Sequence, residues 1–184
     1  HAPALEFGGE NKVEPCHRDR CPYRVICKGD TVTISLPMGS GKSFTVRELI
    51  HDSTSLNKYK RILVVVGRVS FGISILKSFE GLGFKSYKEK DAKSADRVVV
   101  QINSLPKIVD TPNGVRSYDL IIMDEVVTLL NHFGDDVHFK KRRVVFGLLK
   151  YLCTKVDKLI VMDADIEKFS HTKWFLTECG RKVT

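Results

Sequence analysis

The sequence predicts an α/β fold, a three-layer structure in which helices cover both faces of a parallel sheet. From Thr31 onward, apolar runs of strand length alternate with segments of helical periodicity. A glycine-rich loop, Pro37–Ser43, joins the first strand run to the first helix. Polar side chains follow the later strand runs, and in parallel sheets ligands bind where the carboxyl ends of the strands meet.

The first part of the sheet is predicted from two strands and two helices. Thr31–Leu36 is rich in β-branched residues, and Arg61–Val66 (RILVVV) is almost wholly apolar, which indicates a strand buried on both faces. Lys42–His51 follows the glycine-rich loop as a helix. A second helix over about Ser70–Leu82 is predicted from an apolar face made by Ile73, Leu76 and Phe79.

The rest of the chain repeats this pattern. Further strands are expected at Phe84–Tyr87, Arg97–Ile102, Tyr118–Met123 and Lys158–Met162. Helical segments are expected at 104–109, 127–131 and 144–154, and Thr111–Gly114 is expected to be a loop because it contains Pro and Gly. Residues 1–30 are polar and aperiodic, and we interpret them as an irregular lead-in to a single domain, 31–184.

Composition sets the broad class of the protein. With 42% hydrophobic and 28% charged residues, 184 residues are enough for one globular domain with its own core. The longest apolar runs are strand-sized and no secretory signal is visible, so we expect no membrane partner and a nuclear or cytoplasmic location. The first residue is His rather than Met, which suggests a piece of a longer protein.

Charge and cysteine content leave two questions open. The formal net charge of +8 suits a polyanion, although the basic run at Lys140–Arg143 is equally typical of a solvated helix face. Five cysteines, an odd number, indicate reduced thiols rather than a disulfide framework. A zinc site is the alternative for one cluster, although its spacing differs from that of structural zinc sites; its members are Cys16, His17, Cys21 and Cys27.

The glycine-rich loop predicts a nucleoside triphosphate site. Gly39 and Gly41 can adopt backbone angles closed to other residues, so that loop N–H groups point at phosphate oxygens. Lys42 would reach the outer phosphates and the Ser43 hydroxyl would ligate Mg²⁺, with Pro37, Met38 and Ser40 completing the cradle. Leu36 stands where the full phosphate-loop pattern has glycine. The alternative is a flexible surface turn.

A second motif, LIIMDEV, places Asp124 and Glu125 at the end of an apolar strand. In phosphate-loop enzymes such an acid holds Mg²⁺ and a neighbour orients the attacking water, which makes Asp124 a metal ligand and Glu125 a general base. The alternative is a helix N-terminus, where acids are favoured by the helix dipole. Adjacent acids suit hydrolysis better than phosphoryl transfer to a small molecule. Val127 takes the fourth position of this motif.

Three further strand ends carry weaker signals. Arg68 and Ser70 follow RILVVV, and Asn103 and Ser104 follow RVVVQI, with groups able to contact a phosphodiester backbone. The last strand ends in two acids, Asp163 and Asp165. Each alone is an ordinary loop start or helix cap, and their regular placement is what favours a site.

Together these motifs resemble the first RecA-like motor lobe of superfamily 2 helicases, a phosphate-loop NTPase domain. The resemblance runs from Thr31 to about Ile166 and rests on PMGSGKS, VVVGRVS, VVQINSLPKI, IIMDEVVTLL and VMDADI. Within that superfamily these motif sequences are most similar to those of herpesvirus-type replication origin-binding helicases. The adenine-reading motif of such lobes is not found in residues 1–30, and the second lobe is not present in this sequence.

The resemblance implies a function and its partners. ATP and Mg²⁺ would be bound by the glycine-rich loop, and Lys42, Asp124 and Glu125 would be catalytic. Arg68, Ser70, Asn103 and Ser104 would contact nucleic acid, with single-stranded or forked DNA favoured over RNA. Residues Asp163 and Asp165 would couple hydrolysis to movement. The arginine that stabilises transferred phosphate would come from the second lobe, so slow hydrolysis is expected without it.

Two other functions are compatible with the sequence. One is a phosphate-loop NTPase that does not act on nucleic acid, such as a nucleotide kinase or a regulatory ATPase. The other is a DNA-binding module that has lost its motor chemistry, against which the intact Lys42, Asp124 and Glu125 argue.

Overall fold

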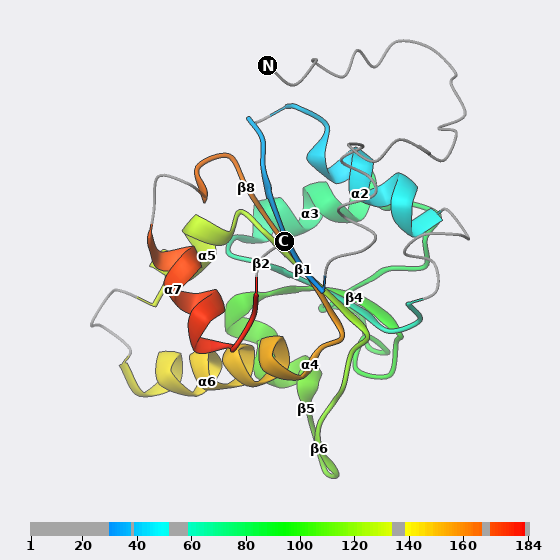
Figure 1. Cartoon of the computed structure of the whole chain (residues 1–184). Coiled ribbons are helices and arrows are strands. Elements are labelled where there is room, and N and C mark those ends of the chain that lie inside the picture. The colour runs from blue at the N-terminus through cyan, green and yellow to red at the C-terminus, as the bar shows by residue number, and fades with distance from the viewer. Residues whose placement is uncertain (1–29, 38, 52–58, 134–138, 167–169, 183–184) are drawn as a thin grey trace.

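The computed structural model describes residues 30–37, 39–51, 59–133, 139–166 and 170–182 (Figure 1). Residues 1–29 of the expected lead-in lie outside these ranges, and so does Met38 of the glycine-rich loop. The possible zinc cluster falls in the same undescribed part; its members are Cys16, His17, Cys21 and Cys27. The side chains of Phe139 and Lys140 are also outside the described set.

A six-stranded sheet forms the centre of the molecule, and every pairing in it is parallel. The strand order across it is β1 (Thr31–Ser35), β8 (Lys158–Asp163), β7 (Leu120–Asp124), β2 (Ile62–Val66), β4 (Arg97–Gln101) and β3 (Lys85–Ser86). The parallel α/β sheet expected from the sequence is therefore confirmed.

Helices lie on both sides of the sheet and complete three layers (Figure 1). One face carries α2 (Lys42–His51) and α3 (Val69–Ser78). The other carries α4 (Leu105–Val109), α5 (Val126–Asn131), α6 (Phe139–Lys155) and α7 (Ser170–Glu178). A short 3₁₀ helix, η2 (Ile102–Ser104), connects β4 to α4.

The core is divided by the sheet, and the strands alternate between its two halves. On β2, Ile62, Val64 and Val66 face the α2–α3 side, whereas Leu63 and Val65 face the α4–α7 side. All five residues are fully buried, which explains the uninterrupted apolar run in the sequence.

Four elements differ from the sequence expectation. Helix α3 ends at Ser78 rather than near Leu82. Helix α6 begins at Phe139 rather than Val144, because its first turns are basic and show no apolar periodicity. The segment expected as a loop at Thr111–Gly114 includes the turn of a small hairpin, β5 (Asp110–Thr111) with β6 (Gly114–Val115). Helix α7 was not expected, because Trp174, Phe175 and Leu176 are consecutive and do not show a single apolar face.

The register brings the carboxyl ends of the strands to one edge. Ser35 pairs with Asp163, Met162 with Asp124, and Val66 with both Asp124 and Gln101. The glycine-rich loop and the later polar strand ends thus emerge side by side.

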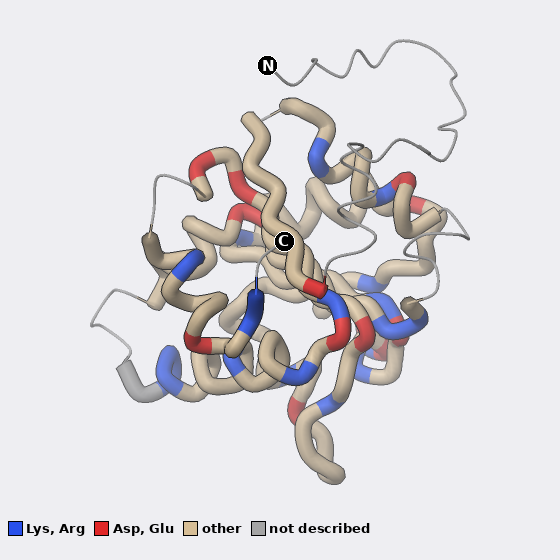
Figure 2. The backbone as a smooth tube through the Cα atoms, viewed as in Figure 1, with Lys and Arg blue, Asp and Glu red and all other residues tan. Residues whose placement is uncertain are grey.

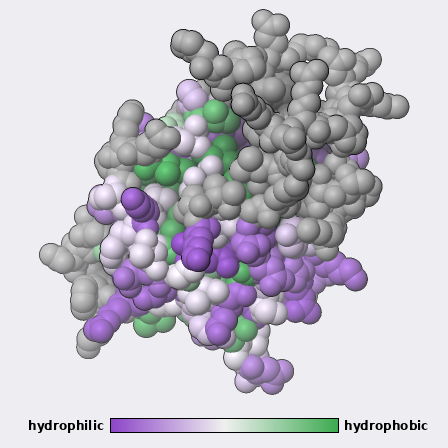
Figure 3. All heavy atoms as spheres, viewed as in Figure 1, coloured by the Kyte–Doolittle hydropathy of each residue, from purple (hydrophilic) through white to green (hydrophobic). Residues whose placement is uncertain are grey.

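Among the described residues visible in Figure 3, hydrophilic side chains dominate the lower part of the view and hydrophobic side chains lie around the edge strand β1. Within the described ranges, no helix combines the length and the apolar character that a membrane crossing requires.

Candidate nucleotide site and neighbouring strand ends

The glycine-rich loop leaves β1 and turns into α2 through two left-handed glycines. Gly39 has φ of 77° and Gly41 has φ of 83°, values that other residues adopt only with strain. Leu36 does not have a positive φ, so the missing glycine of the sequence pattern is not needed there. The loop is closed by Ser40 N–H, which donates to the Pro37 carbonyl at 3.2 Å.

Lys42 begins α2 and folds back under the loop. Its Nζ donates to the carbonyl of Leu36 at 2.6 Å and to that of Pro37 at 3.3 Å, and the residue is only 8% exposed. The Ser40 hydroxyl is buried and has no hydrogen-bond partner among the described residues. The loop therefore contains a buried cation and an unsatisfied hydroxyl, both of which phosphate oxygens could satisfy.

Asp124 ends β7 and Glu125 follows it; the two acids differ in backbone conformation but share an electrostatic environment. Asp124 is buried, and its Oδ1 accepts the Glu125 N–H at 3.1 Å. Burial, followed by the Glu125 charge, raises the pKa of Asp124 to about 6, and the nearby Lys42 opposes this shift. Glu125 adopts a left-handed conformation, with φ of 52° and ψ of 50°. Such a conformation costs a non-glycine residue ~1–3 kcal/mol and is concentrated at functional sites.

Burial also raises the pKa of Glu125, and the charge of Asp163 adds to this effect. The cations Lys42 and Arg68 lower the pKa of the same carboxyl. Residues from four separate segments thus act on one another here, and Figure 2 shows acidic backbone segments gathered near the ends of β7 and β8.

Asp163 connects the end of β8 to α5. Its Oδ2 accepts the Val127 N–H at 2.8 Å, and its Oδ1 accepts the Asp165 N–H at 3.0 Å. The residue as a whole is 4% exposed. The buried carboxylate is therefore held by two backbone donors, one of which lies in the helix that follows Glu125.

The ends of β2 and β4 are joined by Gln101. Its Nε2 donates to the Gly67 carbonyl at 3.1 Å, and its Oε1 accepts the Asn103 N–H at 3.1 Å. Nε2 of His132, the C-cap of α5, lies 2.7 Å from Oδ1 of Asn103. These contacts connect both strand ends to α5.

The remaining predicted residues lie on the same edge. Arg68 is exposed and stands 5.8 Å from the centre of the Phe71 ring, Ser70 is exposed in the first turn of α3, and Ser104 is half-buried. Sequence reasoning missed Gln101 and His132. The Gln101 side chain is the one polar interruption of RVVVQI and was a usable signal, whereas nothing in the local sequence singles out His132.

The donor set fits Mg²⁺ held partly by a nucleotide. In the described part of the chain, no group of three His, Cys, Asp or Glu side chains could hold a metal ion by itself. Asp124 is a desolvated carboxylate that a cation would stabilise, and Ser43 stands beside Lys42 in the first turn of α2. One carboxylate and one hydroxyl, completed by phosphate oxygens and water, is an arrangement that Mg²⁺ accepts.

The model of the family described as "Origin of replication binding protein" matches residues 25–170. The chain is 33% identical over 151 residues to "Uncharacterized putative helicase R8" of Acanthamoeba polyphaga mimivirus, covering 77% of this chain and 14% of that protein. It is 27% identical over 155 residues to the replication origin-binding protein of varicella-zoster virus (strain Dumas), covering 79% of this chain and 18% of that protein.

Among solved structures, the Sulfolobus solfataricus SWI2/SNF2 ATPase core in complex with dsDNA matches with a TM-score of 0.56 and 17% identity. The match covers 82% of this chain and 31% of that one. At this identity the likeness concerns the fold, and it confirms the RecA-like architecture. The chain spans less than a fifth of the length of the two viral relatives.

Proposed function

The chain belongs to the origin of replication binding protein family, and on that premise we propose that it is the ATP-binding first lobe of a helicase or translocase that acts on DNA during replication. The observation that carries this proposal is the meeting of the glycine-rich loop with the acids of β7. The Lys42 charge acts on the pKa of both Asp124 and Glu125, so cation and acids lie within one site.

Phosphate binding would use groups that are already in place. The N–H groups around Gly39 and Gly41, together with the start of α2, would hold phosphate oxygens. Lys42 would exchange its contacts with the Leu36 and Pro37 carbonyls for the outer phosphates. Ser43 and Asp124 would hold Mg²⁺, which when bound neutralises part of the phosphate charge.

Hydrolysis needs a base for the attacking water, and Glu125 is the candidate. Its raised pKa means that it takes up a proton more readily than an exposed glutamate does, which suits a general base. The left-handed backbone at Glu125 fixes the direction in which the side chain leaves the strand. In this assignment Lys42, Asp124 and Glu125 are the catalytic residues.

Nucleic acid would lie across the neighbouring strand ends. Arg68, Ser70, Asn103 and Ser104 offer a cation, an amide and hydroxyls to a phosphodiester backbone. Single-stranded or forked DNA is the proposed partner, in preference to RNA. The link from Gln101 to Gly67 would keep the two strand ends in a fixed relation during binding.

Coupling would pass through Asp163 and its neighbour Asp165, because Asp163 binds the N–H of Val127 directly behind the catalytic acids. A second lobe of the same parent protein would supply the arginine that stabilises the transferred phosphoryl group, worth about 10³–10⁵ in rate in related enzymes. The protein would act inside the cell, in nucleus or cytoplasm, and would be encoded by a virus or a mobile element; the viral relatives reported above support the first of these two origins.

Single-stranded DNA added to the parent protein tests the proposal. We expect oligothymidine to stimulate ATP hydrolysis in the wild type, and Glu125→Gln to abolish turnover while ATP still binds. The Asp157→Asn variant, which changes an exposed aspartate before β8, serves as the control and should retain stimulation. ATP hydrolysis that is indifferent to DNA would instead support an NTPase that does not act on nucleic acid.

A further inference from the structure

An aromatic cluster joins α6 to α7 outside the nucleotide site. The Phe146 ring is stacked on that of Trp174, with centroids 6.1 Å apart and planes 16° apart. Phe146 also makes edge contacts with Phe133 at 5.1 Å and with Phe175 at 5.8 Å. Phe175 is fully buried, so the cluster is anchored in the core.

Trp174 is the exposed end of this cluster. It is 54% exposed although its ring is stacked on Phe146. Aromatic side chains held in this way lose little conformational entropy when a further flat group stacks on them, and they act as platforms for bases in proteins that bind single strands.

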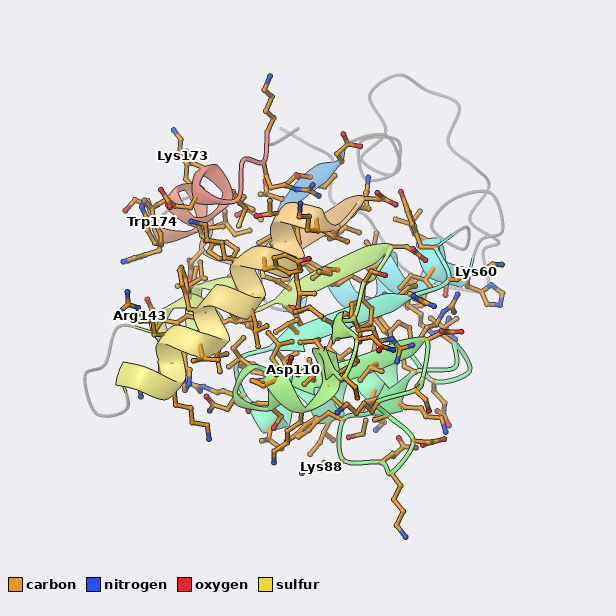
Figure 4. All side chains as sticks on the ribbon, turned by 90° about the horizontal axis from the view of Figure 1, so that it is seen from below. Lys60, Lys88, Asp110, Arg143, Lys173 and Trp174 are labelled. Atoms are coloured by element: carbon orange, nitrogen blue, oxygen red, sulfur yellow. The ribbon has the colours of Figure 1, made fainter. Side chains whose placement is uncertain are left out.

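The surroundings of Trp174 are basic. Every charged residue of α6 is a lysine or an arginine, and Figure 2 shows basic segments along this helix. Arg143 of α6 and Lys173 of α7 are exposed and lie on the same side of the molecule as Trp174 (Figure 4). Neither forms an ion pair with another described residue, whereas Glu178, the one acid of α7, is paired with Lys150.

Contacts between side chains connect this surface to the strand ends. Asn103, at the end of β4, meets His132, and the His132 ring lies edge-on to Phe133 at 5.9 Å. Phe133 in turn contacts Phe146, which carries Trp174. A continuous row of side chains therefore runs from the proposed nucleic-acid track to the exposed ring.

We propose that Trp174, Arg143 and Lys173 form a second contact surface for single-stranded nucleic acid, with a base stacked on Trp174 and backbone phosphates on the two cations. The proposal rests on the function proposed above and extends its binding track beyond β2 and β4. A positive charge without an ion-pair partner among the described residues, beside an exposed aromatic ring, is the combination that favours binding of a single strand.

Trp174 is the only tryptophan of the 184-residue chain, so its fluorescence reports on this surface alone. Labelled oligothymidines of about 6 and about 16 nucleotides would be titrated into the chain, within the usual range of single-strand site sizes. Label anisotropy measures binding anywhere on the chain. We expect both oligonucleotides to bind, and the longer one to quench Trp174 more strongly because it reaches past Asn103.

Variants separate stacking from folding. Trp174→Ala should weaken binding of the longer oligonucleotide at least about 5-fold, whereas Trp174→Phe, which keeps a ring, should retain most of the affinity. The Tyr151→Ala variant is the matched control, because Tyr151 is 48% exposed on α6 and makes no ring contact with the described aromatic residues. Arg143→Gln and Lys173→Gln should each lower the slope of log affinity against log salt by about 0.7.

Three other results would contradict either the second contact surface or the proposed function. Binding by anisotropy without any response from Trp174, and with Trp174→Ala unchanged, would overturn the second surface and leave the proposed function intact. Absence of any DNA binding by the wild type would count against the proposed function itself. Quenching by polyglutamate but not by oligothymidine would assign the surface to an acidic protein partner and overturn the proposal.

Discussion

Among single residues, the acids at the ends of β7 and β8 differ in the hydrogen bonds that they accept and in the charges beside them. Asp163 accepts hydrogen bonds from two backbone N–H groups, whereas Asp124 accepts one and stands next to Glu125. The pKa of Asp124 is raised to about 6 by burial and by the Glu125 charge. In the proposed site Asp124 would receive a cation, whereas Asp163 holds the backbone of α5.

Asp124 makes stability depend on pH in a definite direction. Because burial raises the pKa of Asp124 from the ordinary value of 3.8 to about 6 in the folded state, the fold loses stability as the pH rises between these two values, by up to about 3 kcal/mol. Asp124→Asn removes this loss. We expect the variant to exceed the wild type by ~1–3 kcal/mol in urea unfolding at pH 7, with no difference near pH 4. A constant difference at both pH values would contradict the assignment.

Asp163 is expected to behave in the opposite way. Asp163→Ala leaves the buried N–H of Val127 without an acceptor, which should lower the free energy of unfolding by ~1–3 kcal/mol. The exposed Asp157, just before the start of β8, provides the control. Asp157→Ala should change the free energy of unfolding by less than about 0.5 kcal/mol. Urea titration of both variants measures the difference. Equal effects would show that the Val127 contact does not stabilise the fold.

The position of these acids at strand ends could be predicted from the sequence, but their backbone contacts could not. Val127 takes the fourth position of the acidic motif, and it contacts Asp163 through its main-chain N–H while its side chain packs in the core. A sequence pattern describes side chains, so a contact made by a main-chain N–H leaves no signal in it. The carbonyls that accept hydrogen bonds from Lys42 Nζ are also main-chain groups, so these contacts leave no signal in the sequence either.

At the scale of elements, the loop after β2 and helix α5 approach each other closely at Gly67. A Cβ on Gly67 would lie 3.1 Å from Leu129 Cα and 3.2 Å from Leu129 N, both backbone atoms of α5. The Gly67 carbonyl also accepts the hydrogen bond from Gln101. Gly67 thus allows the ends of β2 and β4 to sit directly against the helix that follows Glu125.

A matched pair of glycine substitutions tests this packing. Gly67→Ala should destabilise the chain by ~1–3 kcal/mol, because backbone atoms must shift to admit the methyl group. Gly147→Ala in α6 meets nothing within 4 Å and should stabilise it by ~0.5–1 kcal/mol through helix propensity. Thermal or urea unfolding compares the two. A neutral Gly67→Ala would mean that the loop does not rest on α5.

The strands were predictable because buried parallel strands are continuous apolar runs, and the predicted boundaries of β2 and β4 agree with the structure to within a residue. Helices were less predictable where packing overrides local pattern. The start of α6 was not predicted because the segment KKRR has no apolar periodicity. In α7, Phe175 and Leu176 are buried in the core whereas the neighbouring Trp174 is exposed, so the helix shows no regular apolar pattern. The aromatic cluster depends on contacts between α5, α6 and α7, which no local window of sequence contains.

At the scale of the whole molecule, the described sheet brings together every proposed group of the first lobe except Met38, which lies outside the described residues. The proposed arginine from a second lobe is the group that this lobe would need for rapid turnover. We therefore expect the 184-residue chain to bind ATP with Mg²⁺ and to hydrolyse it at least about 10³-fold more slowly than the parent protein with DNA. Single-turnover assays measure the rate of ATP hydrolysis by the 184-residue chain and by the parent protein with DNA. Rapid, DNA-stimulated turnover by the chain alone would contradict the division of the site between two lobes.

We propose above that the loop at Gly39–Ser43 binds nucleotide, and the affinity of the chain for ATP decides whether it does. Titration of the chain with a fluorescent ATP analogue and Mg²⁺ should give saturable binding, with affinity reduced about 10- to 100-fold in Lys42→Ala, because the charge-assisted contacts to phosphate are lost. The Lys77→Ala variant, which changes an exposed lysine of α3, should bind like the wild type. Equal affinity in Lys42→Ala and the wild type would contradict the nucleotide site.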